Sequence, residues 1–208
     1  MASNNTTPRD PASGDRRRMG GDHPHPTSPD RAAGIVLGAA VIAMGLLAGL
    51  FYDWSIAVMP GLTAADDRTL VDAMQQMIDK IENPAFFLIF FGAPALAAVA
   101  LFQARRSGPP KTAGWIVAGL ALYTMTVVVT FAFHFPLNED LVKAGDPDQI
   151  ENLAAVRDDF VAPWVAWNIV RTLASTAAFG SLVWALVLHG RMGRAQQPHG
   201  TRPRGYAA

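Results

Sequence analysis

Two stripes of polar side chains run along apolar segments of this sequence, and their residue types could do chemistry. Spacings of three and four residues place Tyr123, Thr126, Thr130 and His134 on one helical face. The same spacings place Trp164, Asn168, Arg171 and Ser175 on another face, with Trp167 beside it. A charge at the centre of a membrane helix costs about 2.5–3.5 kcal/mol on insertion scales, so such residues usually face a bundle interior and pair. The stripes therefore indicate a polar site inside the protein.

Six polar groups are expected at one depth, near the same end of their helices. They are Asp53, Asn83, His134, Asn138, Asn168 and Arg171. We expect them to converge on one pocket, with Asp53 and Arg171 facing each other or sharing a hydrogen-bonded network. Two of these groups also have plainer interpretations: His134 as a satisfied interface residue, and Arg171 as a side chain that reaches the headgroups. The tryptophans likewise can be read as membrane-belt anchors.

Four apolar blocks must position these groups. They lie at about 33–57, 84–103, 113–134 and 164–188. Each has about the 20 residues that a helix needs to cross roughly 30 Å of hydrocarbon. None alternates as the strands of a barrel would. The fold class is therefore all-α: a polytopic membrane protein with a bundle of four transmembrane helices.

Short segments outside the blocks complete the expected organisation. Residues 1–31 and 191–208, rich in Pro, Gly, Ser and charged residues, are expected to be disordered tails around a membrane domain at 32–190. Residues 64–82 have helical apolar spacing and predict an amphipathic helix after the first span. Asn83-Pro84 then starts the second span. A short helical stretch is expected in the loop before the fourth span.

Charge is strongly polarised along the chain although the net charge is zero. Twelve of the 17 basic residues lie in the tails and in the loop between the second and third blocks. Thirteen of the 17 acidic residues lie in the opposite loops or just before them. The positive-inside rule then places both termini in the cytoplasm of a multi-pass protein of the cell membrane.

Composition excludes several classes of chemistry. The chain has no cysteine, so disulfides, thiolate catalysis and cysteine metal sites are excluded. No nucleotide fingerprint or redox motif is present, and we expect no cofactor, no metal site and no nucleic-acid partner. The bilayer is the expected partner. The oligomeric state is left open, because the Gly-x-x-x-Gly pairs of the first block predict close helix contacts without saying whether they join two copies.

Four runs of residues resemble the anthrone-oxygenase-like family of small four-helix membrane proteins, long catalogued as a domain of unknown function. These are VMPGL (58–62), AMQQMIDKIENPAFFLIFFGAP (73–94), FPLNEDL (135–141) and PWVAWNIVRTLASTAAFGSL (163–182). The resemblance spans about residues 34–188. Its signature positions are Pro136, Leu137, Asn138, Trp167, Asn168 and Arg171. The family commonly has Asn in place of His134, many members have His in place of Asn168, and the position of Asp53 is often apolar.

The resemblance implies an oxidoreductase, a monooxygenase that converts an anthrone-type polyketide to a quinone with O2. In that reaction His134 would be the base, because an unperturbed pKa near 6.5 suits proton abstraction. Arg171, Asn138 and Asn168 would stabilise the anion. Trp164 and Trp167 would stack on a flat, lipophilic aromatic substrate, with Asp53, Asn83 and Tyr123 nearby.

The alternative is a non-enzymatic membrane protein: a scaffold, a partner subunit or a binder of lipophilic molecules. The amides and the guanidinium would then tie helix ends to loops. Cavity shape separates the two functions. An enzyme needs an apolar chamber of about 300 Å³ or more with polar groups pointing in, whereas a structural network fills that space with its own side chains.

Overall fold

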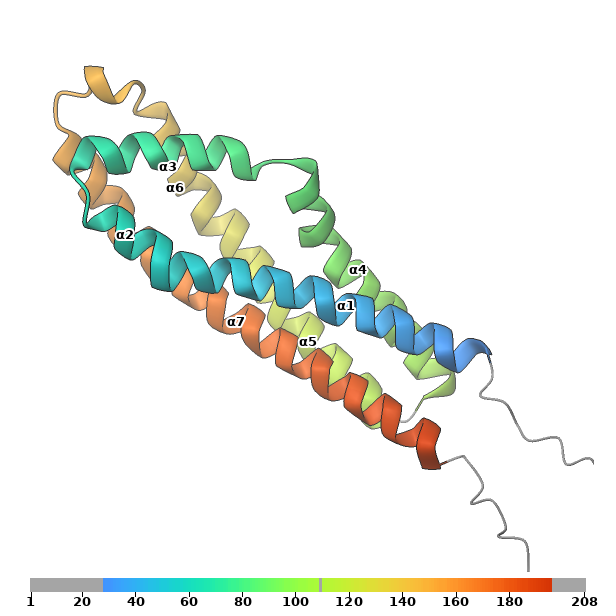
Figure 1. Cartoon of the computed structure of the whole chain (residues 1–208). Helices are drawn as coiled ribbons and strands as arrows, with labels where there is room; N and C mark the ends of the chain where they lie inside the picture. The colour runs from blue at the N-terminus through green and yellow to red at the C-terminus, as the bar shows by residue number, and fades with distance from the viewer. Residues whose placement is uncertain (1–27, 109, 196–208) are drawn as a thin grey trace, which may run out of the picture.

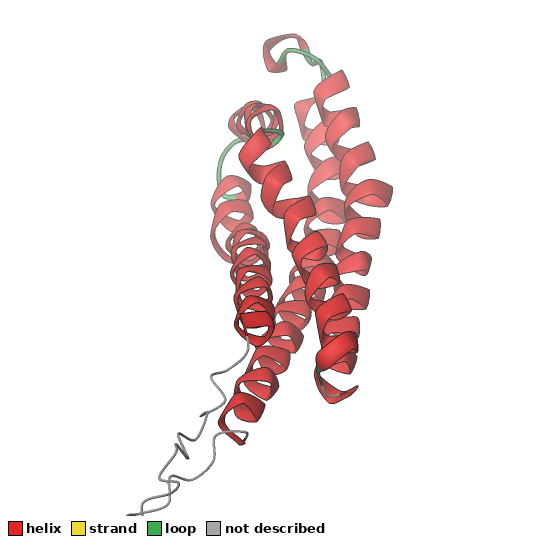
Figure 2. Cartoon of the chain, turned by 90° about the vertical axis from the view of Figure 1, so that its right-hand side faces the viewer, coloured by secondary structure: helices red, strands yellow, loops and turns green. Residues whose placement is uncertain are grey.

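Four long helical rods lie side by side in a bundle, as Figures 1 and 2 show from two directions. The computed structural model describes residues 28–108 and 110–195, and every regular element in these ranges is a helix. The tails predicted at either end fall largely outside these ranges. The start of α1 and the end of α7 lie at the same end of the bundle (Figure 1).

The rods are built from six α-helices and two π-helical turns among the described residues. The first rod joins α1 (Ser28–Asp53), the π turn η1 (Trp54–Val58) and α2 (Met59–Thr63). The second is α4 (Pro84–Ser107). The third joins α5 (Pro110–Val129), the π turn η2 (Thr130–His134) and α6 (Phe135–Lys143). The fourth is α7 (Leu153–Ala195). The connecting segments contain α3 (Asp67–Ile81) and the 3₁₀ turn η3 (Pro147–Gln149).

All four rods are long and apolar enough to cross a membrane. The predicted fold class is therefore confirmed: the chain is an all-α membrane protein. The third rod passes through Pro136 without a break, from α5 through η2 into α6. The fourth rod likewise runs through Pro163, so that the short helix expected before the fourth span is its first part.

In the first and third rods, a π turn directly before a proline lets the helix continue through that proline. Proline has no backbone N–H, and its ring clashes with the carbonyl four residues earlier. Widening the helix over one turn relieves that clash. In η1 the carbonyl of Trp54 accepts from the N–H of Met59, just before Pro60. In η2 the carbonyl of Thr130 accepts from the N–H of Phe135, just before Pro136.

The predicted amphipathic helix is α3, which runs across one end of the bundle (Figure 1). We call this the loop end. Leu70, Val71, Met74 and Ile78 are its buried residues. Polar contacts hold its start: Arg68 bonds to Asp148 at 2.6 Å and lowers the pKa of that carboxyl. A second cation, Arg157, donates to the carbonyls of Thr63 and Ala65 and to Asp67.

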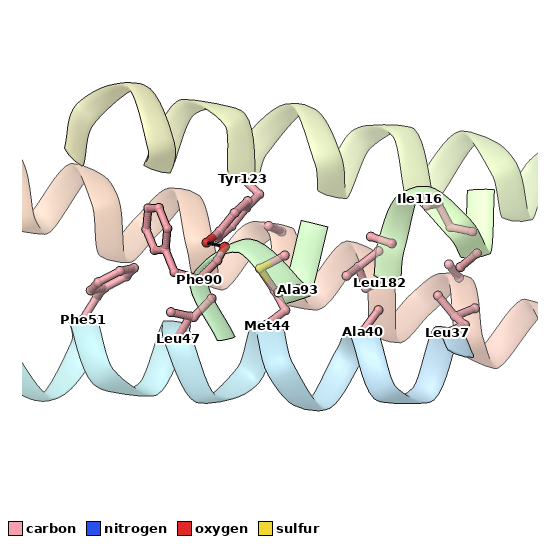
Figure 3. Close-up of a cluster of buried hydrophobic side chains, with 14 residues drawn as sticks. Leu37, Ala40, Met44, Leu47, Phe51, Phe90, Ala93, Ile116, Tyr123 and Leu182 are labelled. Atoms are coloured by element: carbon pink, nitrogen blue, oxygen red, sulfur yellow. Dashed lines mark hydrogen bonds between the residues drawn. The ribbon is translucent and has the colours of Figure 1, made fainter. Parts of the chain in front are cut away.

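The apolar core runs along the axis of the bundle, where α1, α4, α5 and α7 meet. Figure 3 shows its central side chains, among them Met44, Phe90, Tyr123 and Leu182. Small residues let the helices approach closely. A Cβ on Gly45 would lie 3.0 Å from the ring of Phe179, so this glycine of the first block serves a contact between α1 and α7 of the same chain.

One buried hydrogen bond in this core satisfies a backbone carbonyl that a proline inside α4 leaves without its usual donor. Pro94 cannot donate to the carbonyl of Phe90, four residues before it. The hydroxyl of Tyr123 donates to that carbonyl instead, at 2.6 Å (Figure 3). An unpaired carbonyl in apolar surroundings is costly, so Tyr123 stabilises the pairing of α4 with α5.

Removing this hydroxyl is expected to destabilise the protein, and restoring the missing N–H is expected to rescue it. Tyr123→Phe should cost about 1–3 kcal/mol, because the Phe90 carbonyl is left without a donor. Adding Pro94→Ala to that variant supplies an N–H four residues after Phe90 and should recover part of the loss. Thermal unfolding in detergent measures both, with Tyr52→Phe at an exposed position as the control. A double variant no more stable than Tyr123→Phe contradicts this explanation.

Candidate functional site

The site is organised around the backbone carbonyl of Phe51, on the first rod just before the π turn η1. Three side chains donate to this oxygen: Asn168 Nδ2 at 3.1 Å, Thr172 Oγ1 at 2.9 Å and Ser55 Oγ at 3.2 Å. Asn168 Nδ2 also donates to Ser55 Oγ at 2.8 Å. Both hydrogens of the Asn168 amide are therefore used to fix α7 against the first rod.

This fixed amide holds Arg171 one helical turn further along α7. Its Nη2 donates to Asn168 Oδ1 at 2.8 Å. The guanidinium carbon lies 4.2 Å from the ring centre of Phe51 and 5.9 Å from that of Trp164. These contacts orient the guanidinium by cation–π attraction.

Arg171 is buried without an anion to balance its charge. Its side chain belongs to a residue only 7% exposed, and Nε has no hydrogen-bond partner. No carboxylate among the described residues forms an ion pair with it; their ion pairs all involve other cations. Burying a guanidinium alone is expensive, so this arrangement points to a negatively charged ligand.

His134, at the end of η2, is the second buried polar group without a partner. It is 2% exposed, and neither Nδ1 nor Nε2 forms a hydrogen bond. Its ring meets that of Trp164 edge to face, with centres 5.1 Å apart. An unsatisfied imidazole in a folded interior calls for an explanation, and a ligand that bonds to it supplies one.

Both residues line one chamber of about 330 Å³ near the loop end. Its walls come from all four rods and from α3. The aromatic wall residues are Phe51, Trp54, Phe86, Phe87, Phe90, Phe91, Phe131, Phe135 and Trp164. Met74, Met77, Ile78 and Ile81 of α3 cover it, and Leu50 completes the apolar part. The polar wall residues are Glu82, Thr130, His134, Asn138 and Arg171. The chamber is thus mostly apolar, with a few polar groups pointing in, as ligand pockets usually are.

Asn138 joins the chamber to the framework around it. Its Oδ1 accepts from Trp164 Nε1 at 3.1 Å, so the amide and the indole hold each other in place. Trp164 in turn packs against Trp54, with ring centres 5.1 Å apart. The wall between η1, α6 and α7 is therefore a set of mutually positioned side chains.

Four predicted site residues lie elsewhere. Asp53 is exposed and has no ion pair or hydrogen bond with Arg171, so the proposed pairing of these two residues is wrong. Asn83 is exposed and caps α4 by accepting from the N–H groups of Ala85 and Phe86. The Tyr123 hydroxyl donates its hydrogen bond to the Phe90 carbonyl, and Tyr123 does not line the chamber. Trp167 stacks on Phe133 at 3.6 Å, outside the chamber wall.

Sequence reasoning missed the phenylalanine wall and the two hydroxyls that support Asn168. The phenylalanines of α4 and η2 recur at three- and four-residue spacing, which is also what any lipid-facing helix shows. Thr172 follows Arg171 directly, and Ser55 stands five residues before Pro60. A carbonyl near a proline-induced π turn is a position where side-chain donors are needed, and that signal could have found Ser55.

The chamber has little that would hold a metal ion. In residues 28–108 and 110–195, no group of three or more His, Cys, Asp and Glu side chains lies close enough to share one. The charge inside the chamber is that of Arg171, with Glu82 at its edge.

Fold and site together define a four-helix membrane protein with an apolar chamber that encloses an unbalanced cation. Residues 86–181 match a family model described as anthrone oxygenase. This match confirms the resemblance to the anthrone-oxygenase-like family that the sequence motifs predicted. Searches of curated proteins and of solved structures found no match.

Replacing Arg171 by a neutral side chain of similar length separates a ligand-binding role from a structural one. If Arg171 serves to bind a ligand, its buried charge has no counter-charge in the free protein and lowers stability. Arg171→Met should then leave the free energy of unfolding unchanged or raise it by about 1–3 kcal/mol. Thermal unfolding in detergent or nanodiscs measures this. Asn168→Ala is the comparison, because it leaves Ser55 and the Phe51 carbonyl with fewer donors and should destabilise. If Arg171→Met lowers stability as much as Asn168→Ala does, Arg171 is a structural tie.

Proposed function

We propose that the protein is an oxygenase that converts an anthrone-type aromatic compound to a quinone with O2, using Arg171 and His134. One observation carries this proposal: an uncompensated guanidinium and an unpartnered imidazole share the wall of one apolar chamber. Such a site suits a flat apolar molecule that becomes an anion during the reaction. The match of residues 86–181 to the anthrone oxygenase family model supports the same chemistry.

The proposed reaction begins with proton transfer. His134 removes a benzylic proton from the anthrone, and the electron pair spreads onto the ketone oxygen as an enolate. That oxygen lies beside Arg171, which stabilises it through a directed N–H donor in apolar surroundings. Asn168 acts through Arg171 as a positioning residue, since its own amide hydrogens are taken by Phe51 and Ser55.

O2 then accepts electrons from the enolate and forms a carbon–oxygen bond. The resulting peroxide anion takes the proton back from His134 and becomes a hydroperoxide. Loss of the remaining benzylic proton, with cleavage of the O–O bond, releases water and leaves the second carbonyl of the quinone. One anthrone and one O2 thus give one quinone and one water, and no electrons are needed from outside.

The aromatic walls of the chamber suit a fused-ring substrate. Rings of Phe90, Phe131 and Trp164 face the space, and flat aromatic molecules gain stacking and edge-to-face contacts with such walls. Asn138 would hold a polar group of the substrate with the part of its amide that Trp164 leaves free.

A lipophilic substrate would reach the chamber from the bilayer between α4 and η2. Phe87, Phe91 and Phe131 line the chamber and are also 41–51% exposed on the surface of membrane-spanning segments. The rings of Phe90 and Phe131 meet across this opening, with centres 6.4 Å apart. Under this proposal the Phe90–Phe131 contact separates the chamber from the bilayer at this point.

The charge distribution supports an orientation in which the loop end faces the outside of the cell. Basic residues gather near the opposite end, in the α4–α5 connection and near the termini. The positive-inside rule would place that end in the cytoplasm of a cell membrane. Glycosylation-site or cysteine-accessibility mapping of the loop containing α3 tests this proposal.

Loss of either polar group is expected to abolish turnover. Membranes containing the protein are incubated with anthrone and O2, and quinone formation is followed by absorbance. His134→Ala should lower kcat about 10²-fold or more. Arg171→Ala should lower it by about 10²–10³-fold, and Arg171→Lys by less, because the charge remains but the planar donor pair does not. Thr124→Ala, at an exposed position bonded to its own helix, is the control. Full turnover in both alanine variants refutes the assignment.

Narrowing the lipid-facing opening is expected to impede substrate access without changing the chemistry. Phe131→Trp enlarges a side chain at the opening and should raise KM for anthrone several-fold with a smaller effect on kcat. Leu88→Trp is the matched control, because Leu88 is 74% exposed on α4 and does not line the chamber. Steady-state kinetics in nanodiscs measure both variants. Equal KM values for the two contradict this access route.

A further inference from the structure

A second cavity of about 420 Å³ opens at the loop end, between α3 and α6. We call it the vestibule. Its wall residues are Gln75, Ile78, Asp79 and Glu82 on one side, and Phe135, Asn138, Glu139, Val142, Lys143, Gly145 and Asp146 on the other. Seven of these eleven residues have polar or charged side chains, against five of nineteen in the chamber.

The vestibule adjoins the chamber. Ile78, Glu82, Phe135 and Asn138 line both spaces. A ligand in either space therefore meets these four side chains, and Glu82 and Asn138 are polar groups that both spaces share.

The frame of the vestibule is set before any ligand arrives. Gln75 Nε2 donates to the carbonyls of Leu141 and Gly145, each at 2.9 Å, and so ties α3 to the end of α6. Gly145 has a φ of +86°, a left-handed conformation that suits glycine and lets the chain turn away after α6. Asn138 is held by Trp164. A preformed frame lowers the cost of ordering on binding.

The charge of the vestibule is negative, and one carboxylate in it is uncommitted. Four acidic side chains and one lysine border it. Glu139 pairs with Lys143 at 2.7 Å, and Asp79 pairs with Lys80 at 2.6 Å. Asp146 accepts from the N–H of Asp148 at 3.0 Å. Among the described residues Glu82 has no bonded partner, and it stands where the vestibule meets the chamber.

We propose that the vestibule is a second subsite of the same binding site, and that Glu82 selects ligands carrying a hydrogen-bond-donating or cationic substituent on the aromatic ring system. The proposal rests on the proposed function for the chamber, in which the rings lie beside His134 and Arg171. The charges of the ligand then complement those of the site: its oxyanion lies toward Arg171, and its donor group lies toward Glu82. An anionic substituent in the vestibule is repelled by the surrounding carboxylates.

Binding of stable quinones tests this inference without requiring turnover. Unsubstituted anthraquinone and an anthraquinone carrying a primary aminomethyl group are titrated against the full-length protein in nanodiscs, and Kd is obtained from quenching of tryptophan fluorescence. The amine is expected to bind about 10-fold more tightly than the unsubstituted compound. Glu82→Gln should remove that preference, and Glu82→Lys should reverse it.

Asp72→Asn is the matched control, because Asp72 is an acidic residue of α3 that bonds to Gln76 and lies outside the vestibule wall. It should keep the full preference for the amine. Equal affinities for the two quinones, or equal effects of Glu82→Gln and Asp72→Asn, overturn the inference. Failure of the proposed oxygenase function would show separately, as absence of quinone formation from anthrone in a protein that still binds these probes selectively.

Discussion

The arrangement of the loop end depends on one costly feature, the burial of the Arg171 guanidinium without a carboxylate. The protein offsets this cost only in part, through one hydrogen bond to Asn168 and the faces of two aromatic rings. Three elements maintain that geometry: α7 carries Asn168, and Asn168 is itself fixed by Ser55 of η1 and by the Phe51 carbonyl of α1. A structural arginine in a membrane is normally paired with an acid, and here Asp53 lies on α1 but does not reach it.

Prolines inside the spans supply the geometry that the site needs. Each one removes an N–H, and in an apolar environment the carbonyl that loses its donor must be satisfied in some other way. Pro94 leaves the Phe90 carbonyl to Tyr123, which joins α4 to α5. Pro60 and Pro136 are each preceded by a π turn, and these two turns place Trp54 and His134 on the chamber wall. The same backbone irregularities that let the rods remain continuous therefore aim the side chains of the site.

The sequence predicts the four spans, the amphipathic α3 and the start of α4 at Asn83-Pro84 well, because these follow from local hydropathy and helix-start rules. It also predicts that His134, Asn138 and Arg171 lie near one another, since stripe positions on a regular helix follow from spacing alone. Asp53 was misjudged because depth along a helix does not fix the direction of a side chain. Tyr123 was misjudged because its partner is a carbonyl freed by a proline on another helix. The phenylalanine wall has no distinguishing pattern, since lipid-facing and cavity-facing phenylalanines look alike in one sequence.

A chamber that touches both lipid and a polar vestibule suits reactants of different solubility. Under the proposed function, the aromatic substrate and O2 both partition into hydrocarbon, and the half-exposed phenylalanines of α4 and η2 face that phase. Water is a product of that reaction, and under the same proposal it would leave by way of the adjoining vestibule at the loop end. His134 and Arg171 both line this chamber, and the nitrogens that have no partner there are available to a substrate.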